Sequence, residues 1–268
     1  MQHRDSFLII TALVLVSLLA WVVTVREMGS MGVGMMTHSM TMGQPFSLSN
    51  AGLYIVFWGV MMVAMMFPSV APMVVLFSTI ARRKQEQNEQ EEQEAQTSSS
   101  RSSSSVWIFV AGYTLLWTLT GGVAYAGDLA MQSLPHAFPS LRTYGSVIGG
   151  ATLVIAGLYQ LTPLKYLCLT QCRSPFGFLV QHWQEGARGA FRMGFHHGAY
   201  CLGCCWSLMA VMFVMGTMNL VWMGILSLVI FVEKIVPHGL NMGKAVGVGL
   251  IGIGLLMAVY PSVFNIQM

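Results

Sequence analysis

The sequence predicts an all-α protein: a polytopic bundle of about seven transmembrane helices, with one amphipathic helix at the cytoplasmic membrane interface. Of the 268 residues, 55% are hydrophobic and only 9% are charged, whereas a soluble domain carries about 25% charged residues. The apolar residues also form several runs of the length that an α-helix needs to cross a bilayer, roughly 17–25 residues. We therefore expect a single integral membrane domain over residues 1–268.

Seven runs are apolar enough to form transmembrane helices. They cover residues 7–25, 51–80, 106–127, 144–161, 198–218, 221–236 and 245–263. The second run contains Pro68 and Pro72, which predict a kink. The sixth is cut short by Glu233 and Lys234, whose charged ends are expected to reach toward water, so six spans is the alternative count. The glycine-rich seventh run suits close helix packing.

The positions of Lys and Arg predict the orientation, because cytoplasmic loops of membrane proteins are enriched in these residues. With seven spans, eleven of them fall on one side: Arg4, Arg82, Arg83, Lys84, Arg101, Lys165, Arg173, Arg188, Arg192, Lys234 and Lys244. Only Arg26 and Arg142 fall on the other side. The N-terminus is therefore predicted to be cytoplasmic and the C-terminus exterior. The net charge of +3 gives no indication of a nucleic-acid partner.

Two connecting segments differ in character. Residues 82–105 are rich in Gln, Glu and Ser and predict a disordered cytoplasmic linker. In the segment 163–197, apolar residues recur at helical spacing on one face: Phe176, Leu179, Val180, Trp183, Ala187, Ala190 and Phe191. This pattern predicts an amphipathic helix in the membrane interface. Such a helix would hold Cys168 and Cys172 near the cytoplasmic mouth of the fifth span.

All five cysteines lie between residues 168 and 205. His197, Cys201, Cys204 and Cys205 follow the spacing i, i+4, i+7, i+8, which keeps them within about 100° of one another on a helix. Cys168 and Cys172 are also four residues apart, and His196 directly precedes His197. Thiolate and imidazole ligands hold soft and borderline metals, so this group could supply two to four ligands to one ion.

The alternative interpretation is that the cysteines are small buried hydrophobic residues without a metal. A disulfide is not expected, because the cytoplasm keeps thiols reduced.

Methionine, with 22 residues, is unusually frequent. Six methionines fall within residues 28–42, inside a glycine-rich exterior loop predicted over residues 28–49. Thioether sulfur binds Cu(I) without having to lose a proton, so Met35, Met36, His38 and Met40 are candidate copper ligands. In the second span, Met62 and Met66 share a face. They either pack in the core or form a relay between the loop and the cysteines.

Three long motifs resemble one bacterial family. They are MMVAMMFPS at 61–69, AGLYQLTPLK at 156–165 continuing to Cys172-Arg-Ser-Pro, and HGAYCLGCCW at 197–206. These motifs are similar to those of the predicted metal-binding integral membrane proteins, a family that includes a copper chaperone encoded beside a polyphenol oxidase (tyrosinase). The resemblance covers residues from about 53 to the end of the chain.

The resemblance implies a non-catalytic protein of the bacterial inner membrane that hands copper, most readily Cu(I), to a tyrosinase-like partner. Zinc is the second metal to consider, since it also accepts Cys and His. Two other functions stay open at this point: a membrane oxidoreductase with bound metal or haem, and a non-catalytic subunit of a membrane complex. The oligomeric state is not predicted.

Overall fold

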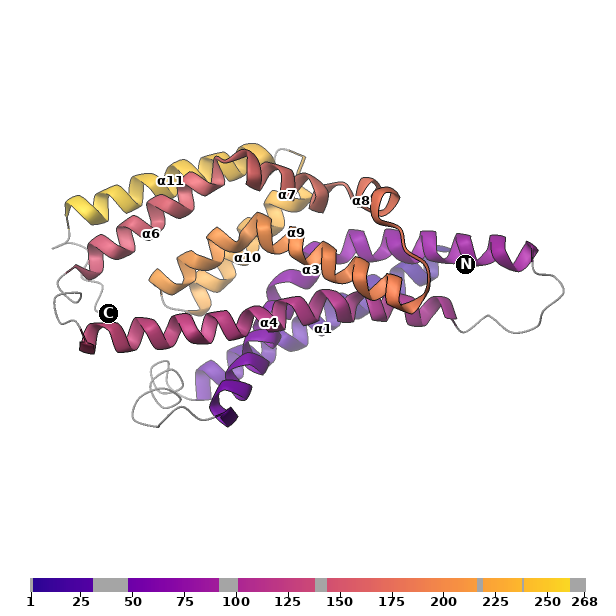
Figure 1. Ribbon diagram of the computed structural model, residues 1–268, viewed down its shortest axis with the longest axis horizontal. Helices are drawn as coiled ribbons and strands as arrows, with labels where there is room; N and C mark the ends of the chain where they lie inside the picture. Colours follow the sequence, from indigo (N-terminus) through magenta and orange to yellow (C-terminus); the bar gives the residue numbers. More distant parts are fainter. Residues whose placement is uncertain are drawn as a thin grey trace.

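The computed structural model describes residues 2–30, 48–91, 101–137, 144–215, 219–237 and 239–260, and every regular element in these ranges is an α-helix (Figure 1). The helices in chain order are α1 (Gln2–Ser30), α3 (Leu48–Glu91), α4 (Arg101–Ala137), α6 (Gly145–Gln160), α7 (Pro163–Arg173), α8 (Pro175–His182), α9 (Gly186–Met215), α10 (Leu220–Ile235) and α11 (Gly239–Val259). The predicted all-α class is therefore confirmed.

The number of membrane spans is lower than expected. Over the described ranges, five helices are long and apolar enough to cross a bilayer, namely α1, α3, α4, α9 and α11. A sixth crossing results if α6 and α7, which are bent by 61° at a short break, form one broken span. Helix α10 has only 16 residues, which is about 24 Å against a hydrocarbon core of about 30 Å. The seven-span count is therefore wrong, although the helical bundle itself is as predicted.

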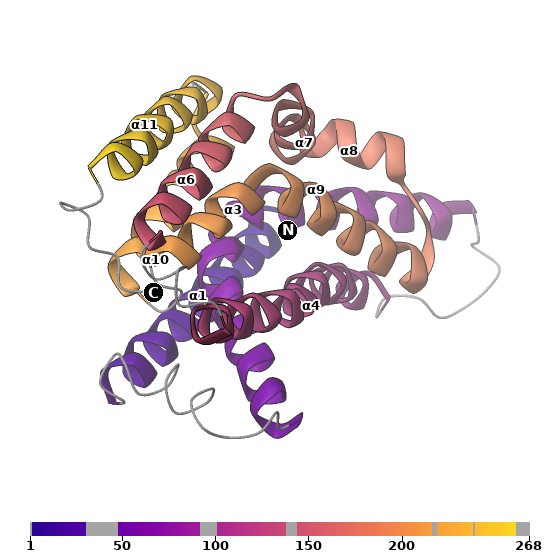
Figure 2. The same ribbon diagram turned by 60° about the vertical axis from the view of Figure 1, so that its left-hand side comes forward.

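The centre of the bundle is built from α3, α4, α9 and α10. Helix α4 packs against both α3 and α9, and α10 contacts α3, α9 and α11. Helix α1 lies against α3, and the α6–α11 pair reaches the centre through contacts between α6 and α9 (Figures 1 and 2). The inward faces of the central helices share one apolar core, which contains Cys201, Cys204 and Cys205 together with methionines from α3.

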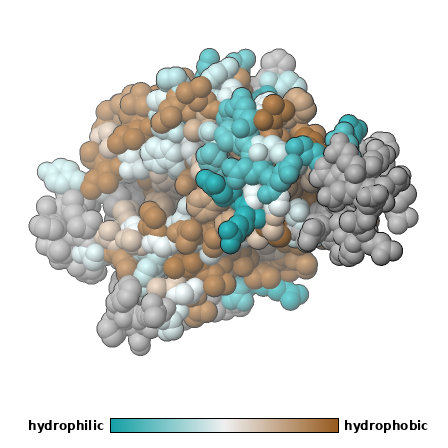
Figure 3. All heavy atoms as spheres, turned by 45° about the vertical axis from the view of Figure 1, so that its right-hand side comes forward, coloured by the Kyte–Doolittle hydropathy of each residue, from teal (hydrophilic) through white to brown (hydrophobic). Residues whose placement is uncertain are grey.

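Many large apolar side chains face outward. On α1 and α11 these side chains are between 51% and 68% exposed, and they include Phe7, Leu8, Leu15, Leu19, Val248, Leu255, Leu256 and Val259. Figure 3 shows extensive apolar areas on one face, with polar residues gathered in a band between them. Apolar surface of this extent on a soluble monomer would be unusual, whereas a lipid environment accommodates it.

Two features of the helices follow from particular residues. Helix α3 contains Pro68 and Pro72, and Figure 2 shows that it changes direction part-way along its length, as expected for internal prolines. Helices α6 and α11 approach closely through glycine. A Cβ atom on Gly150 would lie 2.5 Å from the carbonyl oxygen of Gly254, so only glycine allows this backbone contact.

The segment 163–197 is helical but divided into three parts rather than forming one helix. Helix α7 begins with Pro163 behind the cap residue Thr162, and α8 begins with Pro175 after Ser174. A further break precedes α9, where Gly186 has a φ of +76°. The side chain of Lys84 on α3 lies 3.5 Å from Glu185 in this break. The interfacial location of α7 and α8 stays a prediction.

The ends of the expected linker at 82–105 are helical as well. Helix α3 continues to Glu91 and α4 begins at Arg101. The disorder predicted for the residues between them falls outside the described part of the chain.

Candidate metal centre

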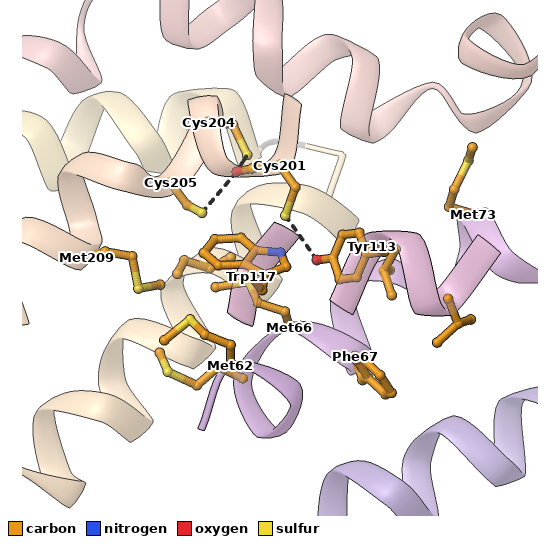
Figure 4. Packing of buried hydrophobic residues seen from close by; sticks show 14 of the residues in the cluster. Met62, Met66, Phe67, Met73, Tyr113, Trp117, Cys201, Cys204, Cys205 and Met209 are labelled. Carbon is orange, nitrogen blue, oxygen red and sulfur yellow. Dashed lines mark hydrogen bonds between the residues drawn. The ribbon is translucent and has the colours of Figure 1, made fainter. Parts of the chain in front are cut away.

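Helix α9 carries three thiols on its buried face. Cys201, Cys204 and Cys205 are each only 1% exposed, and Figure 4 shows them in the core among aromatic and methionine side chains. We expected these residues at the mouth of a span that begins at residue 198. Helix α9 instead runs from Gly186 to Met215, so Cys201 lies about 22 Å along the axis from its first residue. The thiols are therefore near the middle of the helix.

Helix α7 brings the other two cysteines to the same place, because it packs along α9. The sulfur atoms of Cys172 and Cys204 are 3.9 Å apart, although 32 residues separate them in the chain. Cys168 lies against Gly203, where an added Cβ atom would be 2.7 Å from its sulfur. The hydroxyl of Tyr159 donates a hydrogen bond to the carbonyl oxygen of Gly203. Glycine at position 203 thus lets α7 approach the thiol-bearing face of α9.

The thiols are close together but do not converge on one point. Cys204 and Cys205 donate hydrogen bonds of 3.0 and 2.9 Å to the carbonyl oxygen of Cys201, one turn earlier in the helix. Within the described residues, no three Cys, His, Asp or Glu side chains are arranged to hold one ion. All five cysteines are free thiols in the structure.

The two neighbouring histidines have different surroundings. His197 is 3% exposed, its ring is surrounded by Phe109, Tyr113 and Phe178, and its Nδ1 atom has no hydrogen-bond partner. The hydroxyl of Tyr113 in turn lies 3.1 Å from the sulfur of Cys201. His197 therefore belongs to the buried cluster.

His196 faces the other way. It is exposed, and its ring lies 5.0 Å from that of His182 and 5.4 Å from that of Tyr200. The structure does not bring it to the thiols.

Lys234 is a member of the cluster that the sequence did not reveal. We expected Glu233 and Lys234 to reach toward water, but they are 2% and 8% exposed. The ammonium of Lys234 donates to the sulfur of Cys201 at 2.9 Å and to the hydroxyl of Ser69 at 3.3 Å. Glu233 pairs instead with Lys165, with the nitrogen and oxygen 2.7 Å apart. The sequence signal that could have revealed Lys234 is the adjacent pair Glu233 and Lys234 inside an apolar run, because charged residues within membrane helices are usually functional.

The methionines of α3 lie in the same core as the thiols. Met62 and Met66 are 1% and 0% exposed, and Figure 4 shows them near Trp117, with the cysteines beyond it and Met209 to one side. Met35, Met36, His38 and Met40 lie outside the described residues. The methionines of α3 and the thiols of α9 thus belong to one apolar core.

Comparison with models of protein families identifies a family for this chain. The model of a copper chaperone family, PpoB2, matches residues 55–257. The matched region contains all five cysteines, Met62, Met66 and Lys234, and it leaves out α1 and the methionine-rich segment 28–49. No curated protein and no solved structure matches the chain significantly.

Proposed function

The chain belongs to the copper chaperone family PpoB2, and we propose that it is a multi-pass membrane protein that binds Cu(I) at its buried thiols and delivers it to a partner copper enzyme. The site comprises Cys168, Cys172, His197, Cys201, Cys204 and Cys205. Copper is the cargo in this proposal, and the protein carries out no chemical conversion of its own.

The observation that carries the proposal is the approach of Cys172 to Cys204. With a metal–thiolate bond of about 2.3 Å, two sulfurs at this separation would subtend about 116° at a shared ion. That angle lies close to the trigonal value, so these two thiols need little movement to bind one ion. Soft thiolate ligands select Cu(I) among the metals available to a cell, and zinc is the less favoured alternative.

We further propose a route for the ion through the protein. Met35, Met36, His38 and Met40 would capture or release copper on the exterior side. Met62 and Met66, which share the buried core with the thiols, would form the intermediate station. Thioether ligands are neutral and exchange Cu(I) without proton transfer, which suits a path between two stations. The direction of transfer is left open by this scheme.

The resemblance to proteins encoded beside a polyphenol oxidase suggests a tyrosinase-like recipient. In this proposal the chain resides in the bacterial inner membrane, with its N-terminus in the cytoplasm. The count of charges needs the chain to return to the N-terminal side through the short α10, which agrees with the hydrogen bonds from Arg173 on α7 to the carbonyl oxygens of Glu233 and Pro237 at the end of α10. Without the buried Lys165 and Lys234, nine charges would then lie on that side and two on the other. The cytoplasmic N-terminus therefore does not depend on the buried pair.

The test is the metal content of protein purified from membranes of copper-supplied cells. The wild-type chain is compared with a variant in which Cys201, Cys204 and Cys205 are all changed to Ser. Ala210→Ser, further along α9, is the matched control, since it adds a hydroxyl to the helix without removing sulfur. We expect copper in the wild type and the control and its loss from the triple variant. Equal copper in all three proteins would refute the site.

A further inference from the structure

A cationic side chain lies within the cluster of thiols. The ammonium of Lys234 lies among them, 2.9 Å from the sulfur of Cys201, and the residue is 8% exposed. Placing an ammonium in a low-dielectric interior is costly unless partners compensate its charge. The neighbouring carboxylate does not serve as that partner, because Glu233 is held by Lys165 on the opposite side. The positive charge of Lys234 is therefore directed at the sulfur ligands.

This placement matters for the charge of a loaded site. Copper bound by thiols is bound as a thiolate complex, so Cu(I) with two thiolates carries a net charge of −1. An ammonium beside it brings the buried assembly to zero. A divalent ion on the same two thiolates is already neutral, and the ammonium would then leave an uncompensated positive charge in the core.

We propose that Lys234 is the charge-balancing residue of the thiol site and that it makes the site prefer a monovalent soft cation over a divalent one. This inference rests on the proposed function, because it takes the cysteines as the metal ligands. Lys234 itself does not coordinate the ion. It acts through the electric field of its ammonium, which Ser69 helps to hold in place by accepting a hydrogen bond at 3.3 Å.

The size of the effect follows from the geometry. An ion bonded to Cys201 at about 2.3 Å lies no more than about 5.2 Å from the ammonium nitrogen. At that distance and an effective dielectric constant of about 20, one additional unit of charge on the ion changes its affinity by on the order of a hundredfold. The direction of the change in selectivity does not depend on how many thiolates bind. Removing the ammonium charge of Lys234 always reduces its repulsion of a divalent ion more than its repulsion of a monovalent one.

The experiment measures the affinities of the purified full-length protein for Ag(I), an air-stable monovalent probe, and for Zn(II), each against a competing chelator. Lys234→Gln removes the charge and keeps a hydrogen-bond donor on a side chain that is one bond shorter. We expect the ratio of Ag(I) to Zn(II) affinity to fall at least tenfold. Lys234→Arg keeps the charge and is expected to stay near the wild-type ratio.

A double variant, Lys165→Met with Glu233→Gln, is the matched control. It removes a buried ion pair from the same region with no change in net charge, so its ratio should equal that of the wild type. If Lys234→Gln does not fold, Lys234→Met provides the uncharged side chain in an apolar form.

An unchanged ratio in the uncharged variant would overturn the inference, as would an equal fall in Lys234→Arg, since that would indicate a purely structural role. Wild-type protein that binds neither Ag(I) nor Cu(I) would instead overturn the proposed function itself.

Discussion

Replacing Lys165 with Met should destabilise the protein strongly, and the structure indicates by how much. Lys165 and Glu233 form an ion pair with both side chains 3% exposed. Removing the lysine leaves a buried carboxylate whose Oε1 atom already has no hydrogen-bond partner. Breaking a buried pair in this way typically costs about 3–5 kcal/mol.

Protonation sets an upper limit to this cost. A carboxyl group with an ordinary pKa of about 4.3 can be neutralised for about 3.7 kcal/mol at pH 7 and about 1 kcal/mol at pH 5. We therefore expect Lys165→Met to lose about 3–4 kcal/mol at pH 7, which corresponds to a fall in Tm of roughly 6–16 °C. The loss should shrink as the pH is lowered, because the carboxyl then takes up its proton at less cost.

The assay is thermal unfolding of the detergent-solubilised protein, followed by tryptophan fluorescence at pH 7 and pH 5. The control combines Lys165→Met with Glu233→Gln, which removes both charges and should recover most of the lost stability. Two results would refute the reasoning: a single variant within about 1 kcal/mol of the wild type at pH 7, or a double variant as unstable as the single one.

Three further outcomes are expected. Cys172→Ser should lower the copper content of the purified protein more than Cys168→Ser does, because the sulfur of Cys172 is 3.9 Å from that of Cys204; equal losses would count against the Cys172–Cys204 pair. His196→Ala should leave the copper content unchanged, since this ring points away from the thiols, and loss of copper there would place the ion elsewhere. Gly150→Leu should destabilise the protein by about 1–3 kcal/mol in a denaturant titration, because α6 and α11 must separate; unchanged stability would argue against their close contact.

The helical class and most of the helices could be predicted because the hydrophobic pattern is local. Runs of apolar residues and their interruptions indicate where helices form, and all nine described helices overlap a predicted span or the segment 163–197. The count of spans could not be predicted in the same way. Residues 220–235 are mostly apolar, so their sequence resembles that of a transmembrane helix. Only the shortness of α10 and its packing against α3, α9 and α11 distinguish this helix from a full crossing.

By itself, the sequence determined the chemistry of the candidate site. The spacing of Cys201, Cys204 and Cys205 fixes them on one helical face, because 3.6 residues make a turn wherever the helix packs. The preference of these sulfur atoms, and of the methionine thioethers, for soft metals is likewise set by residue type alone.

The tertiary structure decided which side chains meet. That Cys172 approaches Cys204 while His196 turns away depends on how α7 lies along α9. That Lys234 enters the cluster depends on the packing of α10 between its neighbours. A lysine side chain near the end of an apolar run can extend to water or fold inward. The choice rests on partners contributed by α3 and α9, which are far away in the chain.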